Sequence, residues 1–280
     1  MAKSVKKIIP NVLVALMCLL YLFPIYLILT NSFKSRAEMY KNMVALPEKF
    51  SLKYYLSAVS KMNFTTSLIN SIVITIVSIT IIVVLSAMTA WMFVRSANKL
   101  SIALFSILVA TMLIPFQTIM MPLMQEMNWI GKATGLQMTD SIGGLIFMYI
   151  GFGAGMGVFL YHGFISSIPV SLEEAAIIDG CSVWTLFWKI VFPILKPTTM
   201  TLIILDVIWI WNDYLLPSLT LKSTANRTIP ISTAKFFGQY TISWNEAMAA
   251  LVITIIPVAI FYLAAQKYIV KGVAAGAVKG

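Results

Sequence analysis

Polar side chains that could take part in binding or chemistry gather at two places in a very apolar sequence. The first is segment 171–180, SLEEAAIIDG, which places two glutamates and an aspartate in one short stretch. In the second, carboxylate, amide and phenol groups interrupt an apolar run: Asp206, Asn212, Asp213 and Tyr214. The first group suits docking of another protein, and the second suits contact with a hydrogen-bonding ligand.

Residues with the spacing required for catalysis are missing from this sequence. There is no GxxxxGK[ST] pattern, so no phosphate-binding loop of the P-loop type is predicted. The single histidine, His162, ends an apolar run, and Cys18 and Cys181 lie in different segments. These residues form no Ser-His-Asp, Cys-His or metal-ligand pattern. We therefore predict no catalytic residue, no metal site, no cofactor and no enzymatic activity.

The composition is that of a membrane protein. Hydrophobic residues make up 60% of the 280 positions and charged residues only 11%, against the usual quarter in soluble proteins. The net charge of +10 would suggest nucleic acid as a partner of a soluble protein. Here the cations flank apolar runs, so contact with lipid headgroups explains them more simply.

The apolar runs are long enough for six transmembrane helices of about 20 residues each. We expect spans at about 10–32, 67–94, 101–124, 141–163, 198–219 and 247–266. Lysines at the start resemble a signal peptide, but no small-residue cleavage site closes the first run cleanly, so this helix is expected to stay uncleaved. The predicted fold is an all-α polytopic membrane protein with a single transmembrane domain over 1–280.

The fourth span carries alternate glycines: Gly151, Gly153, Gly155 and Gly157. Two pairs have the small-xxx-small spacing that lets helices approach closely in lipid, so we predict helix packing here. Unwinding of the helix around a substrate is the alternative. In the sixth span Pro257 predicts a kink.

The connection between the fourth and fifth spans, 169–197, predicts two short helices. Ser171 and Glu174 have capping-box spacing, and Gly180 is placed to end the first helix with a positive φ. On a helical wheel this helix presents one narrow face, made of Leu172, Ala175, Ala176 and Asp179. A second helix is expected from Ser182 to Pro193, with an apolar stripe made of Trp184, Phe187, Trp188 and Val191.

This connection resembles the EAA loop of inner-membrane permeases in binding-protein-dependent ABC importers. The resemblance lies in Glu174-Ala175-Ala176, Asp179-Gly180 and Ile190 through Pro193. Further segments are similar to the carbohydrate-uptake branch of that family, the maltose and multiple-sugar permeases: Ser32-Phe33-Lys34, Asn70-Ser71, Ala90 through Arg95, Ile114-Pro115, Trp211-Asn212-Asp213 and Ala275 through Gly280.

The resemblance implies a subunit that forms half of the translocation pathway of an ATP-driven sugar importer. Its expected partners are a second, homologous permease, two ATP-binding subunits, an extracytoplasmic solute-binding protein and membrane lipid, but no nucleic acid. The residues that it assigns to coupling with the ATPase are Glu173, Glu174, Ala175, Ala176, Asp179, Gly180 and Pro193. Alternating access is the mechanism that it implies.

The expected location is a bacterial inner membrane with both termini in the cytoplasm. Lys and Arg divide equally between the two sides of the six-span topology, ten on each, so the positive-inside rule does not orient it. The resemblance of the loop to a docking site for a cytoplasmic ATPase orients it instead.

The polar residues of the fifth span are candidates for lining the pathway. A carboxylate at the centre of a span costs about 2.5–3.5 kcal/mol on insertion scales, and such groups usually face a bundle interior or a water-filled cavity. Asp206, Asn212, Asp213 and Tyr214 are therefore interpreted as pathway-lining. An ordinary aromatic belt at the membrane interface is the alternative for the neighbouring Trp and Tyr residues.

Two other functions are weighed against sugar import. A secondary transporter would need coupling-ion residues in several spans, whereas the deep charges here lie in one. A permease for another solute, such as glycerol 3-phosphate, remains the alternative.

Overall fold

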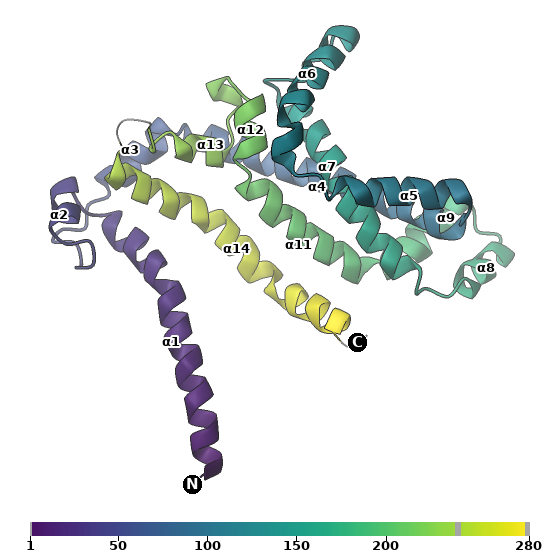
Figure 1. Cartoon of the computed structure of the whole chain (residues 1–280), viewed down its shortest axis with the longest axis horizontal. Helices are drawn as coiled ribbons and strands as arrows, with labels where there is room; N and C mark the ends of the chain where they lie inside the picture. Colours follow the sequence, from purple (N-terminus) through teal and green to yellow (C-terminus); the bar gives the residue numbers. More distant parts are fainter. Residues whose placement is uncertain (1, 239–241, 278–280) are drawn as a thin grey trace. The chain divides into compact units, whose positions relative to one another are not determined.

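The computed structural model describes residues 2–238 and 242–277, and the regular secondary structure in these ranges is helical apart from one isolated bridge between Phe237 and Ile242 (Figure 1). Its α-helices are α1 (Ala2–Asn31), α2 (Arg36–Lys41), α3 (Lys53–Lys61), α4 (Phe64–Arg95), α5 (Lys99–Thr111), α6 (Phe116–Thr134), α7 (Ile142–Ile165), α8 (Ser171–Ile178), α9 (Val183–Leu186), α10 (Phe192–Ile194), α11 (Lys196–Asn212), α12 (Leu215–Thr220), α13 (Ile229–Ala234) and α14 (Trp244–Ala277). A π-helical turn, η1 (Phe187–Val191), joins α9 to α10, and a 3₁₀ turn, η2 (Thr224–Asn226), precedes α13. The all-α prediction is confirmed for these residues, and residues 278–280 of the predicted family-like tail lie outside them.

Four helices of the described chain are long and apolar enough to cross a membrane: α1 from Pro10, α4, α7 and α14 as far as Gln266. Two further candidates are bent pairs, α5 with α6 and the segment 183–194 with α11, which raise the number to six if each pair is one span. The helix α14 passes through Pro257 without interruption. Six spans therefore stay a prediction.

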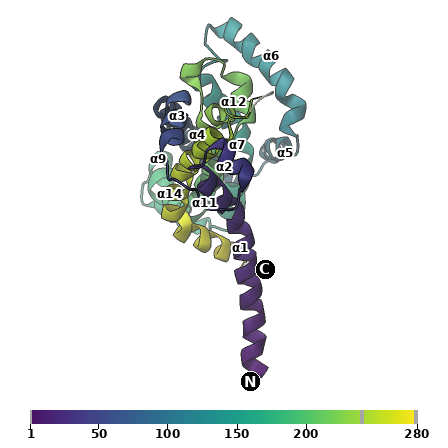
Figure 2. The same cartoon turned by 90° about the vertical axis from the view of Figure 1, so that its left-hand side faces the viewer.

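The third predicted span, 101–124, falls on a broken pair of helices. The axes of α5 and α6 meet at 107°, and the chain between them, 112–115, is not helical (Figure 2). Pro115 occupies the N-cap of α6 in an extended conformation, and the residue before a proline disfavours helical geometry. The fifth predicted span, 198–219, likewise ends early, because Asp213 is extended between α11 and α12.

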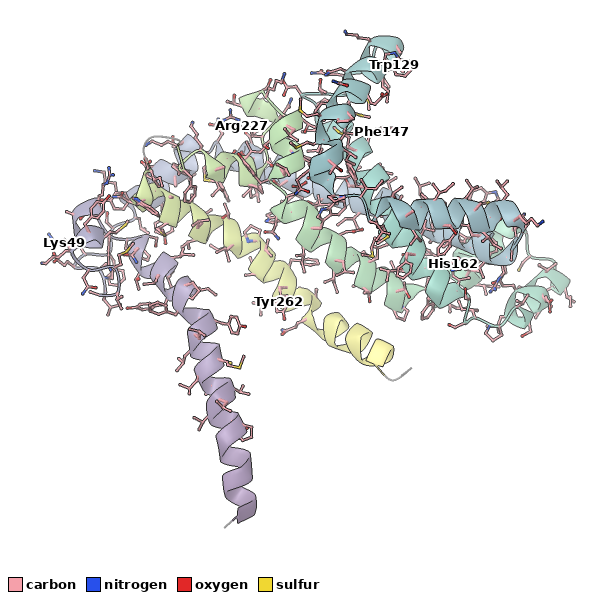
Figure 3. All side chains as sticks on the ribbon, in the orientation of Figure 1. Lys49, Trp129, Phe147, His162, Arg227 and Tyr262 are labelled. Atoms are coloured by element: carbon pink, nitrogen blue, oxygen red, sulfur yellow. The ribbon has the colours of Figure 1, made fainter. Side chains whose placement is uncertain are left out.

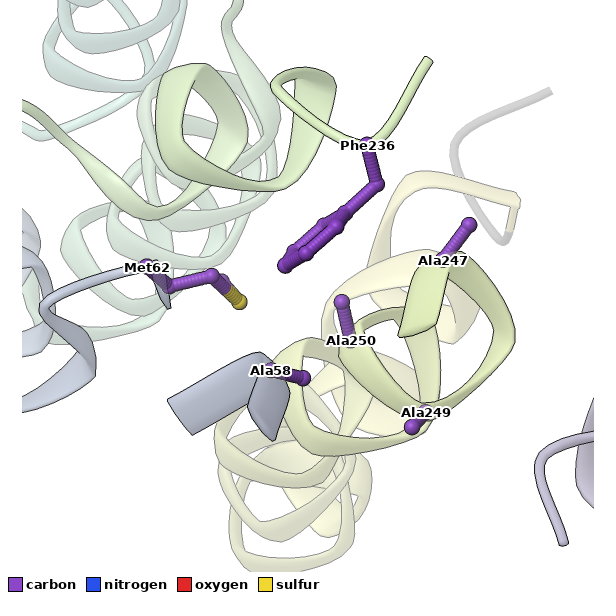
Figure 4. Packing of buried hydrophobic residues seen from close by; sticks show 6 residues of the cluster. All are labelled: Ala58, Met62, Phe236, Ala247, Ala249 and Ala250. Atoms are coloured by element: carbon purple, nitrogen blue, oxygen red, sulfur yellow. The ribbon is translucent and has the colours of Figure 1, made fainter. Parts of the chain in front are cut away.

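The described chain forms two compact units, one made of residues 1–65 with 229–259 and the other of 66–228 with 260–280. In the first unit, alanines let α3 and the start of α14 approach closely around Phe236 and Met62 (Figure 4). Lys61 and Glu246 join the same two helices by an ion pair of 2.6 Å. The capping box that this unit contains is formed by Ser35 and Glu38 at the start of α2, which the sequence analysis missed.

In the second unit, α7 packs against α5 and α11, and glycines of α7 also meet α4. A Cβ atom on Gly153 would lie 2.5 Å from Ile82 Cδ1, and one on Gly157 would lie 2.7 Å from Ser86 Cβ. Gly155 faces α5, where Leu108 O would be 3.1 Å away. The glycines are thus used for packing, as predicted, except Gly151, whose Cβ position is open.

Asp140 lies just before α7, at the end of that helix that is far from α8. It joins the connection before α7 to the connection after α12. Its carboxylate accepts hydrogen bonds from the backbone N–H groups of Lys222 and Ser223, both 2.9 Å, and from the Ser223 hydroxyl. The hydrogen bond from the Ser223 hydroxyl, followed by those from the backbone and Asn226, lowers the pKa of Asp140 to about 2. The sequence contains no short-range signal for this contact, because its partners are about 80 residues apart.

We predict that Gly157→Ala lowers the stability of the second unit by about 1–3 kcal/mol, because the added methyl overpacks a site closed by the Ser86 side chain, whose Cβ is fixed to the backbone of α4. Gly153→Ala should cost less, since the end of the Ile82 side chain can rotate away. The measurement is the thermal unfolding midpoint in detergent, with Gly151→Ala as the matched control. Equal midpoints for Gly157→Ala and Gly151→Ala would contradict the packing role.

Candidate functional site

The loop between α7 and α11 begins with α8, which ends in a Schellman motif. The N–H of Gly180 donates to Ile177 O and the N–H of Cys181 donates to Ala176 O, both at 3.0 Å. Gly180 has φ = +83°, so the predicted positive φ is confirmed. A Cβ atom at this glycine would meet nothing within 4 Å, and the constraint on this position is therefore purely conformational.

One detail predicted for α8 is wrong. Ser171 is the first helical residue, the N-cap is Val170, and no side chain caps the helix, so the capping box between Ser171 and Glu174 is not formed. The side chains that α8 buries are Glu173 and Ala176, whereas Leu172 and Asp179 of the predicted face are exposed. The short helix is held by one glutamate and one alanine, because it lies at the edge of the bundle and has neighbours on one side.

The second helix of the loop is continuous in direction but irregular in hydrogen bonding. Ser182 caps α9 by accepting from the Thr185 N–H, as its position predicts. The chain then forms η1 and continues through Pro193 into α10, so the prediction that Pro193 ends the helix is wrong. A π-helical turn changes which carbonyl each N–H must reach, which accommodates a proline that has no N–H to donate.

The predicted apolar stripe of this helix is only half buried. Phe187 and Val191 are buried, but Trp184 and Trp188 are exposed. Four exposed apolar side chains lie at the corner between α8 and α9 and form what we call the corner patch: Ile177, Ile178, Val183 and Trp184. Ile178 is 85% exposed, so this corner is an apolar surface on a connecting loop, which is typical of a protein contact site.

Glu173, the buried residue of α8, is held by the end of α4. Arg95 donates to Glu173 Oε1 from Nε at 2.9 Å and from Nη2 at 2.7 Å, and Trp91 Nε1 donates to Oε2 at 3.0 Å. The Glu173 side chain is only 7% exposed. Removing one partner of such a pair leaves an unpaired buried charge, which typically costs about 3–5 kcal/mol. Sequence reasoning named Glu173 but missed Arg95 and Trp91, although Arg95 is the first charge after a long apolar run.

The other predicted polar site, on α11, borders a cavity of about 860 Å³. Asp206 and Trp209 of α11 line it together with residues of α5, α6 and α7. Among these are Thr111, Met148 and Phe147, of which Phe147 is labelled in Figure 3. Asp206 is 3% exposed, and its Oδ2 has no hydrogen-bond partner. A buried carboxylate oxygen without a partner is costly, so its position at a cavity is consistent with a ligand or water that supplies a donor.

The three other residues predicted for this site, Asn212 at the end of α11 and Asp213 and Tyr214 just after it, have different surroundings. Asp213 accepts from Tyr149 OH through Oδ2 and from the Leu215 N–H through Oδ1, each at 2.9 Å, and so joins the end of α11 to α7 and α12. Asn212 is exposed and donates to Ile208 O at 2.7 Å, one turn back in the same helix. Tyr214 is exposed. Asp213 therefore has a structural use for both carboxylate oxygens, and Asp206 is the group that faces the cavity.

The arrangement defines a class of protein: a helical membrane protein with a mostly apolar cavity that contains one buried carboxylate, and with an exposed apolar corner on a connecting loop. Residues 55–275 match the family described as binding-protein-dependent transport system inner membrane component. The chain belongs to this family. It is a transport subunit and not an enzyme, as predicted, because ATP hydrolysis in these systems is carried out by separate subunits.

Relatives with similar sequences extend over nearly the whole chain. A probable starch degradation products transport system permease protein, AmyC of Thermoanaerobacterium thermosulfurigenes, is 46% identical, with 98% of each chain covered. The melibiose/raffinose/stachyose import permease protein MelC of Bacillus subtilis is 33% identical over 96% of each chain. The multiple sugar-binding transport system permease protein MsmG of Streptococcus mutans is 33% identical over 93% of each chain.

A solved structure supports the fold. A chain from the crystal structure of a bacterial ABC transporter involved in the import of the acidic polysaccharide alginate superposes with a TM-score of 0.82. It covers 96% of this chain and 98% of its own length at 24% identity. At this identity the likeness concerns the fold, which is that of an ABC importer permease.

We predict that Gly180→Ala weakens functional attachment of the ATPase. An alanine at φ = +83° costs about 1 kcal/mol of conformational free energy. Relaxation of this strain would change the orientation of α8 and of the corner patch. The measurement is substrate-driven ATP hydrolysis and affinity for the ATPase subunits in reconstituted complex. Gly163→Ala is the matched control, because its Cβ position is also open but its φ is not positive. Wild-type affinity and coupling in Gly180→Ala would contradict a coupling role for this corner.

Proposed function

We propose that this chain forms half of the translocation pathway of an ATP-driven importer of sugars or oligosaccharides. The observation that carries the proposal is the likeness along nearly the whole chain to permeases named for starch degradation products, melibiose, raffinose and multiple sugars. The other half is a homologous permease, and two ATP-binding subunits and an extracytoplasmic solute-binding protein complete the importer.

The segment 169–197 is proposed as the coupling loop, with Glu173, Glu174, Ala175, Ala176, Asp179, Gly180 and Pro193 as its functional residues. Support comes from the rigid Schellman corner and from the exposed corner patch next to it. A short amphipathic helix that sits in a groove of a partner needs this kind of apolar anchor. Of the seven residues, Glu173 acts inside the chain, because its carboxylate is buried against Arg95.

Asp206, Asn212 and Tyr214 are proposed to line the pathway, and Asp213 to hold the junction between α11 and α12 beside it. The lining of the cavity contains the carboxylate of Asp206 and neither lysine nor arginine. A neutral sugar can donate a hydroxyl to a carboxylate, whereas an anionic phosphate ester would be repelled by it. This difference favours sugars over glycerol 3-phosphate.

The test of the substrate class is uptake by the reconstituted importer of labelled maltotriose and, separately, labelled glycerol 3-phosphate. We expect ATP-dependent uptake of maltotriose, because the relative with 46% identity is named for starch degradation products. Uptake of glycerol 3-phosphate in its place would overturn the sugar assignment. Liposomes that lack the importer serve as the background.

Both termini and the coupling loop are proposed to lie in the cytoplasm, with the connection 221–228 outside. In a Cys18→Ser, Cys181→Ser background, a membrane-impermeant thiol reagent added from outside should label Thr224→Cys and not Val183→Cys. Both positions are exposed, so accessibility from one side alone decides the result. The reverse labelling pattern would overturn the orientation. Lys3 and Lys279 share the side of Val183 in this topology; Lys279 lies outside the described residues.

A further inference from the structure

We propose that the end of α4 is a second attachment point of the coupling loop, and that Trp91 and Arg95 are positioning residues that carry movement of the loop into α4. The inference rests on the proposed coupling function of segment 169–197. By sequence, α8 and η1 could pass a movement only to the helices that flank the loop, α7 and α11. The contacts described below add α4, which is distant from the loop along the chain.

The first contact is made by Glu173, whose two carboxylate oxygens are both used by α4. Arg95 supplies two hydrogen bonds to Oε1 and Trp91 supplies one to Oε2. Arg95 Nη2 also donates to Ile168 O at 3.2 Å, in the connection just before α8. A charged fork with three hydrogen bonds in a desolvated place fixes orientation as well as distance. The start of α8 and the end of α4 are thereby held as one body.

The second contact connects the same tryptophan to the other half of the loop. The rings of Trp91 and Phe187 lie with their centroids 5.5 Å apart, and Phe187 belongs to η1 and is 1% exposed. Phe187 in turn meets Phe192 of α10, with centroids 5.7 Å apart. Trp91 therefore touches α8 through its N–H and η1 through its ring face. One side chain of α4 spans the glycine corner between the two halves of the loop.

The burial pattern explains why this attachment matters for movement. α8 has eight residues and buries only two side chains, so little else fixes its position. α4 has 32 residues and is continuous, so a displacement at its end is carried along its length. Coupling of this kind needs a chain of packed and hydrogen-bonded groups that both ends can bias, and the Glu173–Trp91–Phe187 contacts form one.

The experiment measures whether α8 and α4 move together. Spin labels are attached at Ser171→Cys in α8 and Leu85→Cys in α4, in a Cys18→Ser, Cys181→Ser background; both sites are exposed. Double electron–electron resonance gives their separation in the complete importer in nanodiscs, without nucleotide and after trapping with ATP and vanadate. The expected result is one narrow distance that is the same in both states.

Variants then break the attachment in steps. Trp91→Phe keeps the ring against Phe187 but removes the N–H, and Glu173→Gln removes the charge but keeps side-chain length. In both, the distance should become dependent on ATP or broaden. Glu246→Gln, which breaks the ion pair with Lys61 in the other unit, is the control and should leave the distance unchanged.

Two results overturn the inference: an ATP-dependent distance in the unmutated pair, or an unchanged narrow distance in Trp91→Phe and Glu173→Gln. A purely structural role would lower the yield of complex without making the distance depend on ATP. Failure of the proposed coupling function would give a different experimental result. In that case Ile178→Asp in the corner patch leaves the affinity for the ATPase subunits unchanged, whatever the spin labels report.

Discussion

The close approach of α7 to α4 is the constraint on which the rest of the second unit depends. Gly153 and Gly157 leave no room for a side chain beside Ile82 and Ser86, so the two helices cross at a distance that larger residues would not allow. In lipid, where no hydrophobic force drives helices together, this packing is a main source of association. The crossing also decides where the two helices end relative to each other, which brings Arg95 of α4 to Ile168 and Glu173 after α7.

Three carboxylates of this unit that are buried or partly buried have different hydrogen-bond partners, and the differences suggest their uses. Glu173 is buried and fully paired, so it fixes the position of a short helix. Asp213 is partly buried and bound by Tyr149 and Leu215, so it stabilises a helix junction. Asp206 is buried with an oxygen that lacks a partner beside a cavity. A buried carboxylate with an oxygen that lacks an internal partner is the one most readily assigned to a ligand.

The loop between α7 and α11 has a buried part that is attached to α4 and an exposed apolar part. Its buried groups, Glu173 and Phe187, attach it to α4, while the corner patch is exposed. The bend of 73° before α11 and the π-helical turn mark where the backbone departs from regular geometry. Such departures are frequent at functional sites because they allow a change of hydrogen-bond register at modest cost.

The sequence by itself determined the helical membrane class, the positive φ at Gly180 and the packing use of the glycines. Each of these follows from local spacing or from the conformational limits of one residue. Only the tertiary structure decided that Asp213 is bound while Asp206 faces a cavity, that α8 buries Glu173 in place of Leu172, and that the third span is bent. The surroundings of Asp213 and Glu173 depend on partners that are 64 and 78 residues away, Tyr149 and Arg95. Helical periodicity shows which side chains share a face, but which face is buried is set by neighbours whose positions the local pattern does not contain.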